Sequence, residues 1–223
     1  MSKKNSKENP KPYEFYGKAG ATFSDKDVQK KFGKKSVASG SLGERILFDR
    51  LRGDAKRKSG GWLPKDVPLF CSLKVPGKAS DIDFAFAIGN KILLIDAKMY
   101  GQSGGWYWTK GNDPYLRHNS GYYKSSSGKK IKLSASMRMA KDILSKSATV
   151  KKYGIEVYAI TILVRNEKVK GSKQPNTWFM RYPGKVKAYN EFWGEMFIKF
   201  FCKFQKRTQA TRAAEAYLKR LVQ

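Results

Sequence analysis

The chain has 223 residues, of which 46 are lysine or arginine and 18 are aspartate or glutamate, giving a formal net charge of +28. This length allows one sizeable hydrophobic core with extensions, and the 40% of hydrophobic residues indicates a globular protein. So high a charge indicates a polyanionic partner, with nucleic acid the first expectation and an anionic membrane surface the second.

Cysteine, histidine and hydropathy exclude several other classes of protein. Cys71 and Cys202 are far apart and form no CxxC pair, so we expect neither a zinc site nor a disulfide framework. The single histidine, His118, excludes a histidine-rich metal site. No apolar run approaches the roughly 20 residues of a membrane span, and the basic start lacks the apolar stretch of a secretory signal. We therefore expect a cytoplasmic protein with no membrane partner.

The first segments predict a basic N-terminal arm over residues 1–35 and then a core helix over residues 41–51. The arm is rich in lysine and would add nonspecific affinity for phosphates. In the helix, Ser41 and Glu44 have the spacing of a capping box, and Gly53 suits the far end. Glu44 also begins an apolar stripe that should pack on the sheet, so it either combines that place with closing the cap or points its carboxylate at Asp83 and Asp96 of the hairpin that follows.

Residues 67–75 predict a strand, and residues 80–100 predict a hairpin that turns at Gly89-Asn90, since both turn residues tolerate positive φ. The two-residue turn places Asp83 opposite Asp96, and alternation places Lys98 on the same face as Asp96. The opposite face is apolar. It carries Ile82, Phe84, Phe86, Ile88, Leu93, Ile95 and Ala97. Small alanines beside the carboxylates indicate that the hairpin is covered on both sides.

Two carboxylates opposite each other on paired strands repel, unless a cation lies between them. Aspartate oxygens are ligands that Mg²⁺ prefers, and a nearby lysine can stabilise developing negative charge or position a water. Two other interpretations stay open at this point. In the first, this face of the hairpin is a polar edge exposed to solvent. In the second, Lys98 alone neutralises one of the carboxylates, and no metal is bound.

After the hairpin, a loop rich in glycine, serine and aromatic residues carries basic residues between its aromatic ones. This composition suits contact with a nucleic-acid strand through stacking and charge, although the tryptophans also suit a cover for the core. The candidate nucleic-acid contacts of the whole chain are Lys56, Arg57, Lys58, Trp106, Trp108, Lys110, Arg117 and Lys141.

The rest of the chain predicts a helix, a buried strand and two further helices. Residues 132–146 have a helical apolar stripe, and the nearly continuous apolar run at 155–164 predicts a strand parallel to its neighbour. A short strand is predicted at 178–182. From residue 189 onward, aromatic residues recur at helical spacing, so a helix packs there on the domain or on a partner. A last helix is predicted over 208–223.

This order of elements and acidic groups resembles the restriction-endonuclease-like superfamily with its PD-(D/E)XK motif, and more narrowly the nuclease-related domain, NERD. The likeness covers roughly residues 41–166. It is carried by Gly43-Glu44-Arg45, Asp81-Ile82-Asp83 and Leu94-Ile95-Asp96-Ala97-Lys98-Met99-Tyr100-Gly101, with Trp106 beyond.

The resemblance implies an α/β, restriction-endonuclease-like core, with a mixed central sheet flanked by helices, over residues 36–187. The basic arm precedes this core, and a helical extension over residues 188–223 packs on it.

The activity implied is magnesium-dependent hydrolysis of DNA phosphodiester bonds, with Mn²⁺ as a substitute. The catalytic residues would be Glu44, Asp83, Asp96 and Lys98, and the metal ligands Asp83, Asp96 and the Ala97 carbonyl. Double-stranded DNA is the expected partner, with little sequence preference. The alternatives are a non-catalytic nucleic-acid-binding or packaging protein, a structure-specific junction resolvase, and a homodimer or larger assembly formed through the C-terminal aromatic helix.

Overall fold

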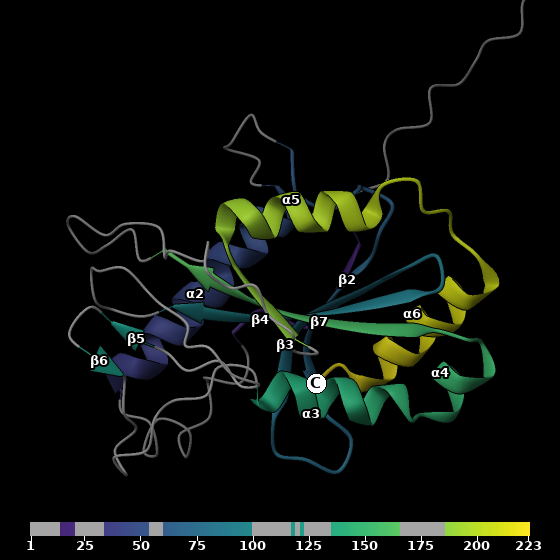
Figure 1. Cartoon of the computed structure of the whole chain (residues 1–223), viewed down its shortest axis with the longest axis horizontal. Coiled ribbons are helices and arrows are strands. Elements are labelled where there is room, and N and C mark those ends of the chain that lie inside the picture. The colour runs from purple at the N-terminus through teal and green to yellow at the C-terminus, as the bar shows by residue number, and fades with distance from the viewer. Residues whose placement is uncertain are drawn as a thin grey trace, which may run out of the picture.

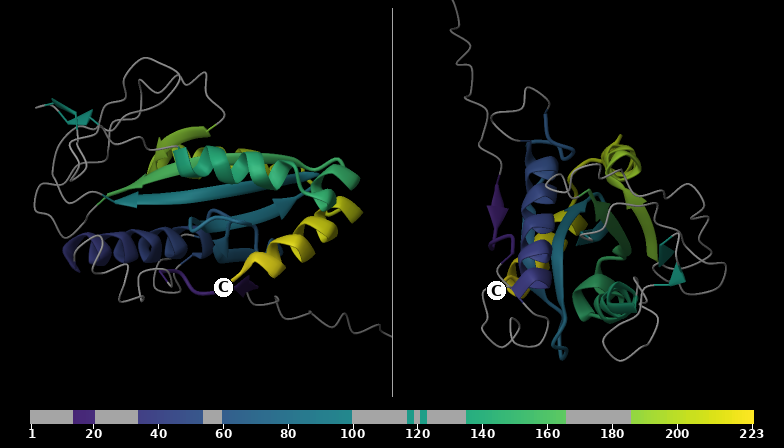
Figure 2. Two further views of the ribbon diagram at one scale, coloured as in Figure 1. Left: turned by 90° about the horizontal axis from the view of Figure 1, so that it is seen from below. Right: turned by 90° about the vertical axis from the view of Figure 1, so that its left-hand side faces the viewer.

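The computed structural model describes residues 14–20, 34–53, 60–99, 117–118, 121–122, 135–165 and 186–223. These residues form an α/β fold with one six-stranded mixed sheet and helices on both of its faces (Figures 1 and 2). The strand order is β1-β2-β3-β4-β7-β8. The strands are β1 Phe15–Tyr16, β2 Leu69–Lys74, β3 Asp81–Ile88, β4 Lys91–Met99, β7 Glu156–Val164 and β8 Val186–Asn190. A separate two-stranded ladder pairs β5 Arg117–His118 with β6 Gly121–Tyr122.

The helices are α2 Lys34–Arg52, α3 Ala135–Ser145, α4 Ala148–Lys152, α5 Glu191–Cys202 and α6 Gln209–Leu221. The predicted α/β class with a mixed sheet flanked by helices is confirmed. Within the part of the chain that the structure describes, no helix combines the length and apolar character needed to cross a bilayer.

The hairpin at the centre of the sheet has the predicted register. Gly89 adopts a φ of +58° in the turn, and the ladder runs from Ile88–Lys91 through Phe86–Leu93 to Phe84–Ile95. On its other edge β4 pairs with β7 in parallel along its whole length, from Lys91–Glu156 to Met99–Val164. A buried strand parallel to its neighbour is therefore confirmed at residues 156–164.

Each face of the sheet packs against its own set of helices. One core cluster joins Leu47 and Leu51 of α2 and Ile198 of α5 to the strands. The other joins Met137 of α3 and Leu218 of α6 to the opposite face. The prediction that the hairpin is covered on both sides is thus confirmed.

One residue of the predicted apolar face belongs to the other cluster. Phe84 lies in the cluster under α2, whereas Ile82 lies in the cluster under α6. The alternation breaks because Ser72, between the pairs Cys71–Phe84 and Leu73–Ile82, has a φ of 51°. An L-residue rarely adopts that conformation, and Asp83 is the residue of β3 that would lie opposite Ser72.

The first core helix starts earlier than predicted. Because α2 begins at Lys34, Ser41 lies inside the helix, and the predicted capping box at Ser41 and Glu44 is wrong. The far end is as predicted. Gly53 has a φ of +80° and donates its backbone N–H to the Asp49 carbonyl at 2.9 Å.

The last part of the chain contributes a strand as well as two helices. The edge strand β8 was not predicted; it pairs with β7 from Ala159–Val186 to Leu163–Asn190. The helix expected from residue 189 begins at Glu191, with Asn190 as its N-cap. The short strand predicted at 178–182 lies outside the described residues.

Candidate active site

Asp96 lies near the carboxyl end of β4 and is held from two sides. Its Oδ1 accepts a hydrogen bond from the Lys98 ammonium at 2.6 Å, and its Oδ2 accepts one from the Thr161 hydroxyl of β7 at 3.3 Å. The Asp96 side chain is buried, whereas Lys98 keeps 35% of its side chain exposed. Lys98 therefore extends from a buried carboxylate toward solvent, where a substrate can reach it.

Asp83 lies where strands β3 and β4 part. The backbone ladder between them ends at Phe84–Ile95, so the predicted pairing of Asp83 with Asp96, one step further, does not form. Beyond that point β3 continues along β2 to Asp81, and β4 continues along β7 to Met99. The Asp83 carboxylate takes the place of a backbone partner, since its Oδ2 accepts the Ala97 N–H at 2.7 Å.

Glu44 reaches the same place from α2. Its side chain is buried, and its Oε2 accepts the backbone N–H of Gly20 at 2.6 Å. The neighbouring Gly43 brings the helix close to the end of β4, because a Cβ there would lie 2.8 Å from the Cβ of Met99. The close crossing positions Glu44 beside the carboxyl end of β4.

The charges of these residues act on one another. Burial raises the pKa of Asp83 well above its ordinary value, and the nearby Asp96 and Glu44 carboxylates raise it further. Burial also raises the pKa of Glu44 to about 7, against the opposing effects of Gly20 and Lys98. The structure thus brings together the four predicted residues Glu44, Asp83, Asp96 and Lys98.

The donor set can be tested against a magnesium ion. Within the described ranges, no three acidic, histidine or cysteine side chains are grouped closely enough to form a protein-made metal cage. Mg²⁺ rarely uses such a cage; it binds through one or two carboxylates and completes its shell with waters and substrate phosphates. Two mutually repelling aspartates, the buried Asp96 and the half-buried Asp83, lie next to the Ala97 backbone and fit that mode of binding, and a cation would relieve their repulsion.

The predicted nucleic-acid contacts are only partly within the described residues. Lys141 lies on α3 with its ammonium 5.8 Å from the Tyr158 ring centre. Tyr158 pairs with Leu93, three residues before Asp96 on β4, so Lys141 is not brought to the carboxylates. The side chain of Arg117 and the residues Lys56, Arg57, Lys58, Trp106, Trp108 and Lys110 lie outside the described part.

Two contacts of the site were missed by the sequence analysis. Thr161 is fully buried and bonds to Asp96; a hydroxyl inside the apolar run 155–164 was the available signal. The Gly20 N–H, which holds Glu44, comes from a segment 24 residues away. Nothing local in the sequence marks it.

None of the protein-family models, curated proteins or solved structures compared with this chain matches it.

Proposed function

We propose that this chain is a metal-dependent nuclease with a restriction-endonuclease-like core that hydrolyses DNA phosphodiester bonds. The observation that carries the proposal is the convergence of Glu44, Asp83, Asp96 and Lys98 at the point where β3 and β4 part. A buried cluster of carboxylates costs folding free energy, so its presence favours a function that uses it.

The charge of the chain supports a nucleic acid as the substrate. A net charge of +28 attracts the phosphate backbone, whatever the base sequence. Binding of this kind positions a duplex without reading it. Double-stranded DNA cut with little sequence preference is therefore the proposed substrate.

Each residue has a task in the proposed reaction. Asp83, Asp96 and the Ala97 carbonyl would hold a magnesium ion, which when bound supplies a water of lowered pKa and neutralises phosphate charge. Lys98 is fixed by Asp96 at 2.6 Å, so its ammonium can orient the attacking water or stabilise the charge that develops on the phosphate.

Glu44 and Thr161 complete the arrangement. With a pKa near 7, the Glu44 carboxyl can accept or release a proton at neutral pH, directly or through a water. Thr161 donates to Asp96 Oδ2 and so fixes the orientation of that carboxylate.

The test is nicking of supercoiled plasmid by the wild type and by Asp96→Asn, with Mg²⁺. We expect Asp96→Asn to lower the nicking rate by on the order of a hundredfold or more, while binding to the same DNA in EDTA is kept. Asp66→Asn is the matched control, because Asp66 is exposed and lies outside the proposed site. It should nick at the wild-type rate.

Two results would contradict the proposed function. Cleavage that persists in Asp96→Asn or in excess EDTA excludes this site as its source. No cleavage by the wild type with Mg²⁺ or Mn²⁺, on supercoiled, linear, branched and single-stranded substrates, together with tight binding, identifies a non-catalytic nucleic-acid-binding protein. Strong preference for the branched substrate would make the nuclease a junction resolvase.

A further inference from the structure

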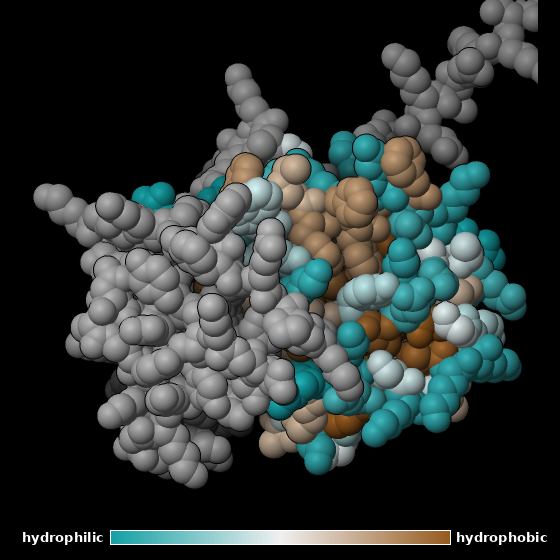
Figure 3. All heavy atoms as spheres, in the orientation of Figure 1, coloured by the Kyte–Doolittle hydropathy of each residue, from teal (hydrophilic) through white to brown (hydrophobic). Residues whose placement is uncertain are grey.

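Helix α5 exposes a ridge of large apolar side chains. Phe192, Met196 and Phe200 recur at four-residue steps along it, and Phe204 continues the spacing just past its end. Phe200 is 77% exposed and Phe204 88% exposed. Figure 3 shows apolar side chains gathered over α5, with hydrophilic ones beside them. An exposed apolar patch of this kind lowers the solubility of a protein, so it indicates a site for a ligand or a partner.

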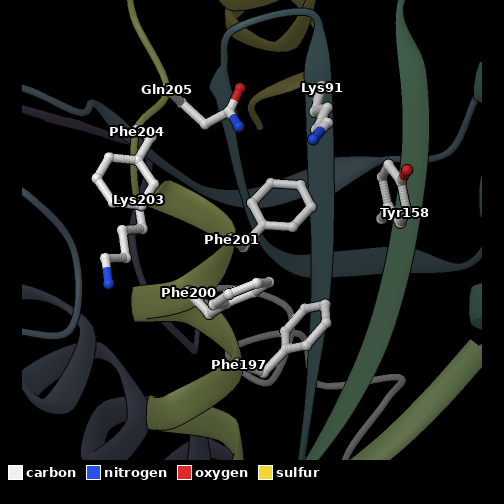
Figure 4. Close-up of a pocket in the computed structure, with 8 residues that line it drawn as sticks. All are labelled: Lys91, Tyr158, Phe197, Phe200, Phe201, Lys203, Phe204 and Gln205. Atoms are coloured by element: carbon white, nitrogen blue, oxygen red, sulfur yellow. The ribbon is translucent and has the colours of Figure 1, made fainter.

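The ridge ends at a cavity of about 380 Å³, which is the size of a small-ligand site. Its wall is aromatic. The Phe201 ring lies edge-on to Tyr158 with centroids 5.3 Å apart, and tilted against Phe197 at 5.8 Å. Figure 4 shows these rings and Phe200 facing Lys91 of β4 and Tyr158 of β7. The open, ring-lined space suits a flat aromatic ligand.

Cations and an amide surround these rings. The Lys91 ammonium lies 5.8 Å from the Phe201 centroid, and the Lys203 ammonium lies 4.8 Å from the Phe204 centroid. Gln205 also lines the cavity, and its amide can both donate and accept. An aromatic group that carries negative charge would find stacking surfaces, charge and a hydrogen-bonding edge here.

The backbone at this cavity is strained and held in place. Phe204 has a φ of 61°, which is unfavourable for a bulky residue and is typical of functional sites. The connection from α5 to α6 is tied to the hairpin turn, because Thr208 and Thr211 both donate to the Gly89 carbonyl, at 3.0 and 2.5 Å. The cavity is therefore preorganised.

We propose that this cavity and the α5 ridge bind the unpaired bases of a single-stranded nucleic acid. Aromatic rings with interspersed lysines are the means by which proteins hold single strands without sequence preference. A second copy of this chain is disfavoured as the occupant, because two molecules of charge +28 repel. A membrane surface would cover the exposed ridge but would leave the ring-lined cavity beside Lys91 and Gln205 unfilled.

The proposed surface is separate from the carboxylates. Lys91 and Asp96 lie on the same strand, five residues apart, which is roughly 17 Å along an extended chain. The other end of α5 is nearer to the site, since Glu191 accepts the backbone N–H of Arg165, just after β7, at 2.8 Å. A single nucleic-acid strand bound along the ridge would therefore run from the end of the sheet that carries the carboxylates to the hairpin turn.

The test measures binding of a fluorescein-labelled oligothymidylate of about 20 nucleotides by anisotropy in EDTA. The variants are Phe200→Ala/Phe204→Ala, Phe200→Tyr/Phe204→Tyr and, as a matched control, Phe15→Ala. Phe15 is 52% exposed and lies on β1, at the opposite edge of the sheet from β8. We expect about tenfold weaker binding for the double alanine variant, from the loss of two stacking surfaces. The tyrosine variant and the control should bind like the wild type, and duplex affinity should stay unchanged in all.

The proposal takes from the proposed function only that the ligand is a nucleic acid, and the use of EDTA keeps cleavage out of the measurement. Unchanged oligothymidylate binding by the double alanine variant overturns it, as does an equal loss of duplex binding. If that variant binds oligothymidylate normally but no longer self-associates in sedimentation, the ridge is a dimer surface. If it instead loses binding to phosphatidylglycerol vesicles, the ridge is a membrane surface.

Discussion

Asp83 shows how a single half-buried residue combines a structural and a chemical role. Its carboxylate accepts a hydrogen bond from the Ala97 N–H at 2.7 Å. The β3–β4 ladder ends before Ala97, so no backbone carbonyl of β3 accepts this N–H. Its raised pKa follows from burial and from two neighbouring carboxylates. The hydrogen bond to the backbone favours the ionised form, but burial disfavours it more strongly. A bound cation would therefore stabilise the ionised form of the Asp83 carboxyl group.

The raised pKa values of Glu44 and Asp83 predict a stability that falls as the pH rises. Between pH 4.5 and about 7 the folded protein binds more protons at Glu44 than the unfolded chain does. The free energy of unfolding therefore decreases through that window, by up to about 3 kcal/mol for Glu44. Urea unfolding at pH 5 and pH 8 in EDTA should show Glu44→Gln gaining stability relative to wild type at the higher pH.

A constant difference in unfolding free energy between Glu44→Gln and wild type at the two pH values would contradict the raised pKa.

Added Mg²⁺ gives a separate test, of metal binding. At pH 8 it should raise the melting temperature of the wild type but not that of Asp83→Asn, because the variant lacks one of the proposed ligands.

Two glycines determine how closely the helices of one face approach the sheet. In α2, a Cβ on Gly43 would lie 2.8 Å from the Cβ of Met99, an atom that moves only with the backbone of β4. In α5, a Cβ on Gly194 would lie 3.1 Å from the Cδ1 of Ile162, the far end of a flexible side chain. The first contact is rigid, and the second can relax.

This difference predicts opposite effects for the same substitution. Gly43→Ala should destabilise the protein by about 1–3 kcal/mol through overpacking, and it should reduce nicking further by moving Glu44 away from β4. Gly194→Ala should be neutral or slightly stabilising, since alanine favours a helix by about 1 kcal/mol over glycine. Chemical denaturation and nicking rates check both. Equal stability of the two variants would show that α2 can shift without cost.

How far the sequence predicts these elements depends on how local their determinants are. The register of β3 and β4 was predictable because a two-residue turn specifies it, and with it came Asp83, Asp96 and Lys98. The start of α2 was not, since a plausible cap at Ser41 masked a helix that begins at Lys34. The contact between Gly20 and Glu44 depends on tertiary packing alone. The short β8 was missed because its buried positions, Val186 and Ala188, form too brief an alternation.

At the scale of the whole molecule, the net charge governs how the protein would approach a polyanion. Forty-six lysines and arginines in 223 residues produce a field that extends beyond any one site, screened over about 10 Å at 0.1 M salt. The field would concentrate a polyanion near the protein without specifying its sequence.

This field predicts a steep dependence of DNA binding on salt. If the chain contacts about 6–10 phosphates, duplex affinity should fall roughly a thousandfold or more between about 50 and 200 mM salt. Anisotropy titrations in EDTA at several salt concentrations give the slope of log affinity against log salt concentration.

The same slope for oligothymidylate tests the contribution of Lys203. Lys203→Gln should reduce this slope by about one, whereas Lys78→Gln, at an exposed position, should leave it unchanged. A slope near zero would argue against phosphate contacts.

Three segments of the chain meet at Ser72. The Ser72 hydroxyl donates to the Lys18 carbonyl at 2.6 Å, and the Ser72 carbonyl accepts the Gln223 N–H at 3.2 Å. A Cβ on Gly17 would lie only 2.8 Å from Val222, so the segment that carries Gly20 rests against the last turn of the fold. The hydrogen bond from Gly20 to Glu44 therefore lies next to a junction of three segments that are distant in the sequence, so a substitution at Val222 can disturb the candidate site without touching any of its residues.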